Sequence, residues 1–239
     1  MHAEVISIVM LHLLHGFTLK VGWRHVPLMW SSQRLVALLA LKEQPMSRAY
    51  VAGTLWPETT DTRANANLRS TLWRVQRTCG KLVVCSSQRL CLVPGVVVDL
   101  QQAVMAAYRM LDSSDGCEDI LNSETLSVLS ADLLPDWYAD HWVVGHRERY
   151  HHLRLHALEA MCERLAATRR YGEAVEAGLA AVRAEPLRES AHQALVKVHL
   201  AEGNRFEATR QYQNYCQLLR SELGLEPSPT LAALLAKNK

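Results

Sequence analysis

Short apolar runs and helically spaced apolar positions alternate along the first hundred residues. Three runs separated by glycines predict strands of a small antiparallel sheet. These runs are residues 11–14, 17–21 and 25–28. Leucines then recur at helical spacing over residues 33–41, with Ser31 as the expected N-cap and Pro45 beyond the end. A second short helix, capped by Ser47, ends before Pro57.

A third predicted helix, over residues 61–79, has one apolar and one polar face. At about 100° per residue the two sets of positions fall on opposite sides of the helix. The apolar stripe, expected to face the core, comprises Ala64, Leu68, Leu72 and Val75. The outward side carries Arg63, Asn67, Ser70, Trp73, Arg74 and Arg77.

Two β-prone runs follow the third helix and predict a hairpin. They are residues 82–85 and 90–93, joined by the polar loop 86–89. Pro94-Gly95 and then Asp99 mark the end of this region. The order of a sheet, three helices and a hairpin predicts a first domain over residues 1–98.

Beyond Asp99 the pattern is helical throughout, which predicts a second domain over residues 99–239. The expected helices cover residues 99–111, 142–168, 171–184, 189–202 and 206–223, with a polar loop at 112–119 and a short tail helix after Pro227 and Pro229.

Two copies of a repeat are detectable in the helical half. At a spacing of 34 residues, the tetratricopeptide period, four positions match: Ala160 with Ala194, Met161 with Leu195, Glu173 with Glu207, and Ala174 with Ala208. Small residues at fixed positions let antiparallel helices pack closely, and stacked pairs leave a concave face for a partner. A helical bundle with coincident alanines is the alternative.

The charge is divided unequally between the two halves. Residues 1–98 hold 11 Lys and Arg against 4 Asp and Glu, a net charge of +7, whereas residues 99–239 hold 15 against 20, a net of −5. A basic first half suggests a nucleic-acid partner for that half alone. Ordinary surface charge is the alternative.

The outward face of the third helix has the chemistry of a DNA reader. Arginine pairs with guanine edges or phosphates, asparagine pairs with adenine, and serine suits phosphate. No acid follows Asp61 on this face, whereas a merely solvated helix face mixes both signs of charge. The candidate DNA-binding residues are Arg63, Asn67, Ser70, Arg74 and Arg77, with Arg89 at the hairpin tip.

Other function classes find little support. The six cysteines form no C-x-x-C pair, and no phosphate-loop, dinucleotide or nucleophile-elbow motif is present, so we expect no enzyme, cofactor or metal. His152 and His156 have metal-ligand spacing, but no cysteine or paired carboxylate completes a site on their face. No membrane span or signal peptide is expected, and reduced thiols suit a cytoplasmic protein.

The chain resembles the Streptomyces antibiotic regulatory proteins, transcriptional activators that join an OmpR/PhoB-type winged helix to a bacterial transcriptional activator domain. In the first half the stretches that carry the resemblance are residues 35–40 (LVALLA), 46–48 (MSR), 55–57 (LWP), 63–69 (RANANLR) and 98–100 (VDL). In the second half they are residues 133–136 (LLPD), 147–149 (RER), 185–189 (EPLRE) and 222–228 (ELGLEPS). Trp73 and Gln76 depart from the family pattern near the end of the third helix.

The resemblance implies an α+β winged helix-turn-helix domain followed by an all-α tetratricopeptide-like domain. The third helix would be the recognition helix and the hairpin the wing. Family members bind promoter direct repeats in double-stranded DNA as homodimers and help to recruit RNA polymerase, often to genes of a biosynthetic cluster. A bacterial cytoplasmic protein, nucleoid-associated when bound to DNA, is therefore expected. The alternative is a tetratricopeptide-like scaffold whose N-terminal domain does not bind DNA.

Overall fold

The computed structural model describes residues 8–236, except 87, 113–115 and 117. Two compact units divide the chain. Unit 1 comprises Met1–Gln102 and Asp132–Arg147, and unit 2 comprises Ala103–Ala131 and Glu148–Lys239. The units are therefore interleaved in sequence, whereas we predicted two contiguous domains that meet after residue 98. The difference is the segment 132–147, which follows the predicted boundary yet packs within unit 1.

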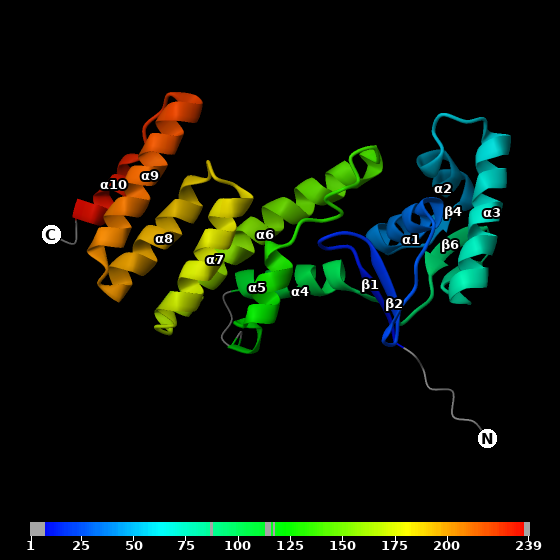
Figure 1. Cartoon of the computed structure of the whole chain (residues 1–239), viewed down its shortest axis with the longest axis horizontal. Coiled ribbons are helices and arrows are strands. Elements are labelled where there is room, and N and C mark those ends of the chain that lie inside the picture. Colours follow the sequence, from blue (N-terminus) through cyan, green and yellow to red (C-terminus); the bar gives the residue numbers. More distant parts are fainter. Residues whose placement is uncertain (1–7, 87, 113–115, 117, 237–239) are drawn as a thin grey trace, which may run out of the picture. The chain divides into compact units, whose positions relative to one another are not determined.

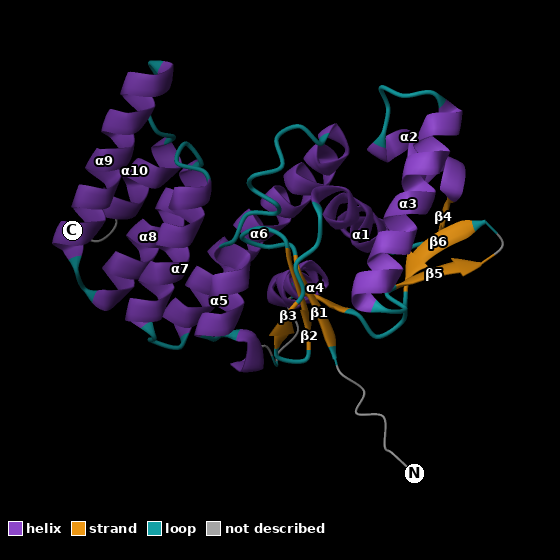
Figure 2. Cartoon of the chain, turned by 45° about the vertical axis from the view of Figure 1, so that its right-hand side comes forward, coloured by secondary structure: helices purple, strands orange, loops and turns teal. Residues whose placement is uncertain are grey.

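Unit 1 contains two sheets (Figures 1 and 2). The first has the strand order β3-β2-β1-β7, with β1 antiparallel to β2 and parallel to β7. Its strands are β1 (Val9–His12), β2 (Thr18–Val21), β3 (Arg24–His25) and β7 (Val97–Val98). The three predicted antiparallel strands are present, although β1 begins two residues before the predicted run and β3 covers residues 24–25 where 25–28 were predicted. The strand β7 was not predicted. The second sheet, of order β4-β6-β5, comprises β4 (Met46–Ser47), β5 (Val83–Ser86) and β6 (Arg89–Leu92).

Three helices precede the β5–β6 hairpin, as predicted. They are α1 (Trp30–Lys42), α2 (Arg48–Leu55) and α3 (Asp61–Cys79). The Ser47 hydroxyl caps α2 by accepting from the Tyr50 amide at 3.2 Å, which confirms that cap. The predicted Ser31 cap of α1 is wrong, because the helix begins at Trp30 and its N-cap is Met29, which forms no side-chain cap bond.

The inward stripe of α3 differs from the predicted one at a single position. Ala64, Leu68 and Val75 are buried as expected, but Thr71 is fully buried and Leu72 is only half-buried. The helix packs against α1 and α2. The stripe therefore centres between Leu68 and Thr71, and Leu72 lies at its flank, where it lines a pocket that also includes Val83 of β5.

The return segment, residues 132–147, is joined to the first sheet by backbone hydrogen bonds. The His15 amide donates to the Asp132 carbonyl at 3.0 Å, and the Leu134 amide donates to the Leu13 carbonyl at 2.9 Å. Beside them, the buried Asp99 carboxylate accepts from the amides of Leu13 and Leu14 at 2.8 and 3.1 Å. These bonds satisfy backbone groups at the end of β1 that would otherwise be buried without partners.

Side chains of the return segment also pack on α1. Buried Asp140 accepts from Arg34 of α1 at 2.7 Å and from the Trp142 indole at 2.8 Å. Buried Trp137 contacts the rings of Trp30 and Phe17, with centroid distances of 4.7 and 6.0 Å. The return segment is therefore part of the core of unit 1.

Unit 2 is built from helices. They are α4 (Asp99–Leu111), α5 (Ser123–Ser130), α6 (His141–Ala167), α7 (Tyr171–Ala184), α8 (Glu189–Glu202), α9 (Arg205–Leu223) and α10 (Pro229–Ala236), with a short 3-10 turn at Glu118–Ile120. The first residues of α4 and α6 belong to unit 1. The α5 helix was not predicted. The predicted loop 112–119 lies partly outside the described residues.

The predicted 34-residue repeat corresponds to two helix pairs, α6–α7 and α8–α9. Its apolar matched positions are buried or partly buried in both copies, with Ala174 of α7 and Ala208 of α9 fully enclosed. Gly178 of α7 lies against Leu195 of α8, so closely that a Cβ there would be 2.5 Å from the leucine side chain. Small residues thus set the helix spacing, as in tetratricopeptide-like architectures. Within the described residues, no helix combines the length and apolarity needed to cross a membrane.

Candidate nucleic-acid interface

The α3 helix is held firmly at both ends and along one face. The Thr60 hydroxyl accepts from the Arg63 amide at 3.5 Å, and Gly80 ends the helix with a φ of 66° while its amide bonds the Gln76 carbonyl. Packing of the inner stripe on α1 and α2 fixes the rotation of the helix. Its polar face is consequently presented to solvent by a rigid support, as precise recognition requires.

The structure places the five predicted α3 residues on one side of the helix. Arg63, Ser70 and Arg77 are exposed, and Asn67 and Arg74 are half-buried. At about 100° per residue they fall within an arc of roughly 80°. The sixth candidate, Arg89, is exposed on β6, where its guanidinium donates to the Pro45 carbonyl at 3.3 Å.

Trp73 lies beside this face, between Arg77 and the flank that carries Arg69, and is 58% exposed. The Arg77 guanidinium lies 4.8 Å from the centre of its ring, which is cation–π geometry. One turn earlier, Arg74 donates to the Ser70 carbonyl at 3.2 Å. Both contacts restrain long side chains, so less rotamer entropy is lost when they bind a partner.

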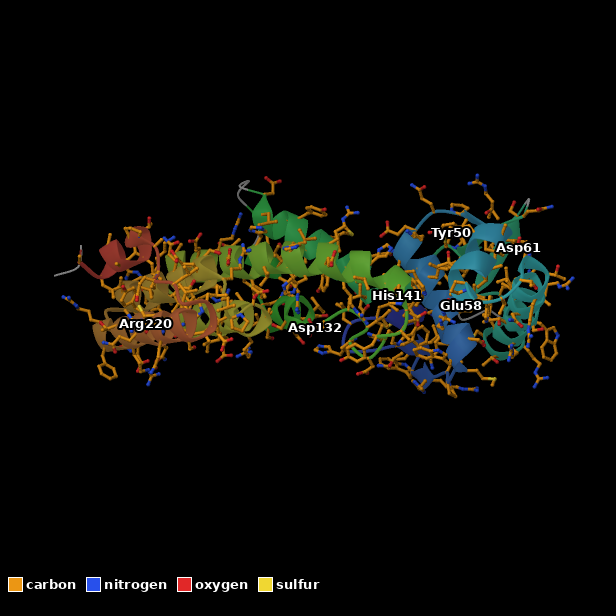
Figure 3. All side chains as sticks on the ribbon, turned by 90° about the horizontal axis from the view of Figure 1, so that it is seen from above. Tyr50, Glu58, Asp61, Asp132, His141 and Arg220 are labelled. Carbon is orange, nitrogen blue, oxygen red and sulfur yellow. The ribbon has the colours of Figure 1, made fainter. Side chains whose placement is uncertain are left out.

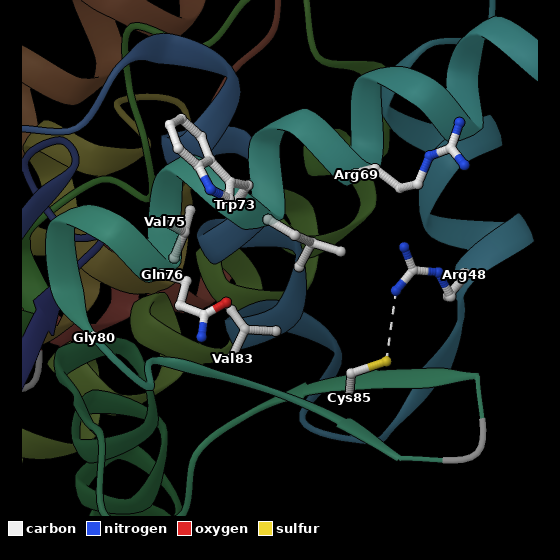
Figure 4. Close-up of a pocket in the computed structure, with 9 residues that line it drawn as sticks. Arg48, Arg69, Trp73, Val75, Gln76, Gly80, Val83 and Cys85 are labelled. Atoms are coloured by element: carbon white, nitrogen blue, oxygen red, sulfur yellow. Dashed lines mark hydrogen bonds between the residues drawn. The ribbon is translucent and has the colours of Figure 1, made fainter.

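Sequence reasoning missed two cations, Arg48 and Arg69. Arg48 is the first residue of α2 and Arg69 lies on α3, and both line a pocket of about 310 Å³ beside the hairpin (Figure 4). The remaining lining residues are Leu72, Trp73, Val75, Gln76, Gly80, Val83 and Cys85. The sequence did contain a signal for Arg69. Arg69 and Gln76 share one flank of α3 and neither is apolar, which indicates that this flank is not part of the core.

Over the part of the chain that the structure describes, the exposed cations of α3 have no acidic partners. Among the described residues, no ion pair joins Arg63, Arg69 or Arg77 to a carboxylate. Glu58 precedes the helix and Asp61 is its first residue, so neither carboxylate belongs to the last turns; both residues are labelled in Figure 3. An uncompensated row of guanidinium groups produces a positive potential that attracts a polyanion.

The arrangement suits binding more than catalysis. A helix with arginine, asparagine and serine on its solvent-facing side has donors for phosphate oxygens and for base edges. Within the described part of the chain, no three histidine, cysteine or acidic side chains are grouped as metal ligands. His156 instead lies 3.1 Å from Arg188, and His151 lies 3.5 Å from Glu185.

Comparisons with known proteins place the chain among bacterial regulators. The sequence profile of the bacterial transcriptional activator domain matches residues 99–237. No curated protein matches the chain. Among solved structures, Mycobacterium tuberculosis EmbR in complex with a low-affinity phosphopeptide is similar, with a TM-score of 0.75 and 18% sequence identity over 97% of this chain. The match covers 65% of the EmbR chain, so this chain spans less than two thirds of that length, and the likeness shows the fold.

Proposed function

Because the chain belongs to the bacterial transcriptional activator domain family, we propose that it is a sequence-specific DNA-binding regulator that activates transcription. The observation that carries DNA binding is the outward face of α3, a row of cations without acidic partners among the described residues, on a helix that the core holds in place. In this proposal unit 1 is a winged helix-turn-helix, with α3 as its recognition helix and the β5–β6 hairpin as its wing.

The proposed DNA contacts differ along α3. Arg63, Asn67 and Ser70 lie in its first half, where a recognition helix inserts most deeply, and we assign them to base edges and nearby phosphates. Arg74 and Arg77 lie toward its end, where the sugar–phosphate backbone is closer. Arg89 on the wing would reach an adjacent phosphate or the minor groove.

The proposed role of unit 2 is protein interaction. Stacked helix pairs offer surfaces suited to protein partners, and the net charge of −5 over residues 99–239 disfavours contact with DNA. We assign to it homodimer contacts on DNA and recruitment of RNA polymerase at promoters with direct repeats, in the bacterial cytoplasm. A biosynthetic gene cluster is the expected target.

Base recognition is tested by Asn67→Ala on an operator obtained by selection from random DNA. Removal of a bidentate hydrogen bond to a base should weaken operator binding by about 1–3 kcal/mol while binding to unselected DNA barely changes. A uniform reduction on all DNA would assign Asn67 to the backbone or to the core instead. A full-length chain that binds no duplex at low salt would favour a protein-binding scaffold.

Pairing on direct repeats is tested by the spacing between half-sites. Two protomers on one face of the duplex need sites about 10–11 base pairs apart. Inserting roughly 5 base pairs, half a turn, should abolish cooperative binding and promoter stimulation, and a full turn should partly restore both. Footprints and in vitro transcription that are insensitive to spacing would contradict the pairing.

A further inference from the structure

The pocket lined by Arg48 and Arg69 brings together two cations from different helices. Arg48 belongs to the first turn of α2 and Arg69 to the middle of α3. In Figure 4 both guanidinium groups lie at the end of the pocket away from Gly80. The contact that orients Arg48 is with the exposed Cys85 of β5, whose sulfur lies 3.5 Å from its Nη1.

In the described part of the chain, no acidic side chain compensates this pair of like charges. Among the described residues neither guanidinium forms an ion pair with a carboxylate. Leu72, Val75 and Val83 contribute apolar surface to the same pocket, which strengthens the repulsion relative to bulk water. The pocket volume of about 310 Å³ far exceeds the roughly 30 Å³ of one water molecule and leaves room for a tetrahedral oxyanion.

We propose that Arg48 and Arg69 together bind one phosphate group, supplied by the backbone of DNA that lies against α3 and the wing. The inference rests on the proposed function and adds a site to it. Guanidinium groups bind phosphate through paired, charge-assisted hydrogen bonds. Two guanidinium groups from separate helices can contact one phosphate from two sides. Arg48 is also at the α2 N-terminus, where the helix dipole adds to the attraction of an anion. The bound phosphate fixes the position of the DNA strand relative to α3, which makes Arg48 and Arg69 positioning residues for the bases that α3 reads.

The test measures the affinity of the full-length chain for a short duplex of mixed sequence over a range of salt concentrations. The variants are Arg48→Gln, Arg69→Gln and the double substitution, with Arg24→Gln on β3 as the control because Arg24 is exposed and outside the pocket. If one phosphate is no longer bound, the slope of log affinity against log salt should flatten by about 0.9 in the double variant. The effects of the single variants should be non-additive because they share one phosphate, and Arg24→Gln should leave the slope unchanged.

Other results would overturn the shared site. Additive effects with a slope change of about 1.8 in the double variant would indicate two separate phosphates. An unchanged slope would show that the pocket is not part of the DNA interface, while leaving the proposed function intact.

A second measurement distinguishes a free anion from DNA phosphate. If the slope is unchanged and inorganic phosphate raises the melting temperature of the wild type but not of the double variant, the ligand is a free anion. A wild type that binds no duplex would instead refute the proposed function itself. Equal melting temperatures of all variants without phosphate confirm that folding is not the cause.

Discussion

The two units of the chain arrange their charges in opposite ways. In unit 2 many cations are paired: Arg109 with Asp119, Arg170 with Glu173, Arg188 with Glu159, Lys197 with Glu163, Arg210 with Glu207, and Arg220 with Glu226. In unit 1 the carboxylates of Asp99 and Asp140 are turned into the core, and α3 presents cations that pair with no carboxylate among the described residues. Exposed ion pairs add little stability, so the difference concerns the surface potential and not the fold. The basic face of α3 in unit 1 attracts a polyanionic ligand such as DNA. The paired charges of unit 2 give its surface no such attraction, which is compatible with a protein partner.

The two units also differ in the internal contacts that stabilise each of them. Unit 1 joins distant segments through a partly buried ion pair and a cluster of aromatic rings, whereas unit 2 packs neighbouring helices through alanine and glycine. Unit 1 therefore depends on a few specific contacts with the return segment, and unit 2 depends on the close spacing of its helices.

The largest effect is expected from Asp140→Ala. This substitution removes the partner of Arg34, whose side chain is 18% exposed, and leaves the Trp142 indole without its acceptor. Breaking such a buried pair should lower the free energy of unfolding by about 3–5 kcal/mol. Denaturant unfolding followed by tryptophan fluorescence measures it.

The matched control is Glu163→Ala, which breaks the exposed pair with Lys197 in unit 2 and should cost at most about 1 kcal/mol. Equal reductions in stability would mean that the return segment is not part of the core of unit 1. The contacts of Asp99 and of the return segment with the first sheet and α1 also predict that a fragment ending at residue 98 folds poorly, because it lacks both.

A somewhat smaller effect is expected from Leu68→Ala on α3. Leu68 is fully buried, so the substitution removes apolar contacts, leaves a cavity and should cost about 2–5 kcal/mol. Leu72→Ala should cost clearly less, because Leu72 is half-buried at the edge of the pocket. Thermal melts of the two variants compare them. A larger destabilisation by Leu72→Ala would place the inner stripe, and hence the DNA face, differently on the helix.

A moderate effect is expected from Gly178→Ala in unit 2. The added Cβ would lie 2.5 Å from the Leu195 side chain and 3.2 Å from Cys162, so α7 and α8 must separate, at a cost of about 1–3 kcal/mol. Gly172→Ala, at the start of the same helix, meets nothing within 4 Å and serves as the control. Calorimetric melting should show destabilisation for Gly178→Ala alone, and an unaffected melt would contradict helix spacing set by small residues.

The smallest effect is a pH dependence confined to unit 2. Burial lowers the pKa of His192, whose ring stacks on Tyr215 at 4.2 Å and bonds the Pro186 carbonyl at 2.9 Å. The unfolded state then binds the proton more readily, so stability should fall as the pH drops through about 6.5, the ordinary value for histidine. His192→Phe keeps the ring stack and should reduce this dependence in melts followed by circular dichroism. An unchanged pH profile in that variant would assign the dependence to other groups.

The periodicity of the sequence predicted most of the fold. Helices α7 and α8 have the predicted bounds, and the order of a sheet, three helices and a hairpin is confirmed. Strands were placed less well because runs of two to four residues carry little periodic signal, as for β3 and β7. The return segment could not be predicted, since its contacts with α1 join residues about a hundred positions apart.

The candidate site was also predicted only in part, and the cause of the errors differs from that in the fold. Hydrophobicity alone placed Leu72 inward in preference to Thr71, and so rotated the expected stripe slightly. Arg69 was missed because it lies on the flank of α3 nearer to the hairpin, and Arg48 because only folding brings α2 beside α3. Whether Arg63, Asn67, Ser70, Arg74, Arg77 and Arg89 contact DNA stays a prediction.

The most direct test of the central claim compares charge neutralisation on the two units. A triple variant of α3, Arg63→Gln with Arg74→Gln and Arg77→Gln, is set against a triple variant of unit 2, Arg170→Gln with Lys197→Gln and Arg210→Gln. Both remove three positive charges, and the affinity of each for duplex DNA is measured against salt concentration. We predict a slope flatter by about 0.9 for each phosphate that the α3 variant no longer binds, and an unchanged slope in the unit 2 variant. Equal slopes in the two variants would contradict the assignment of α3 as the DNA-binding face.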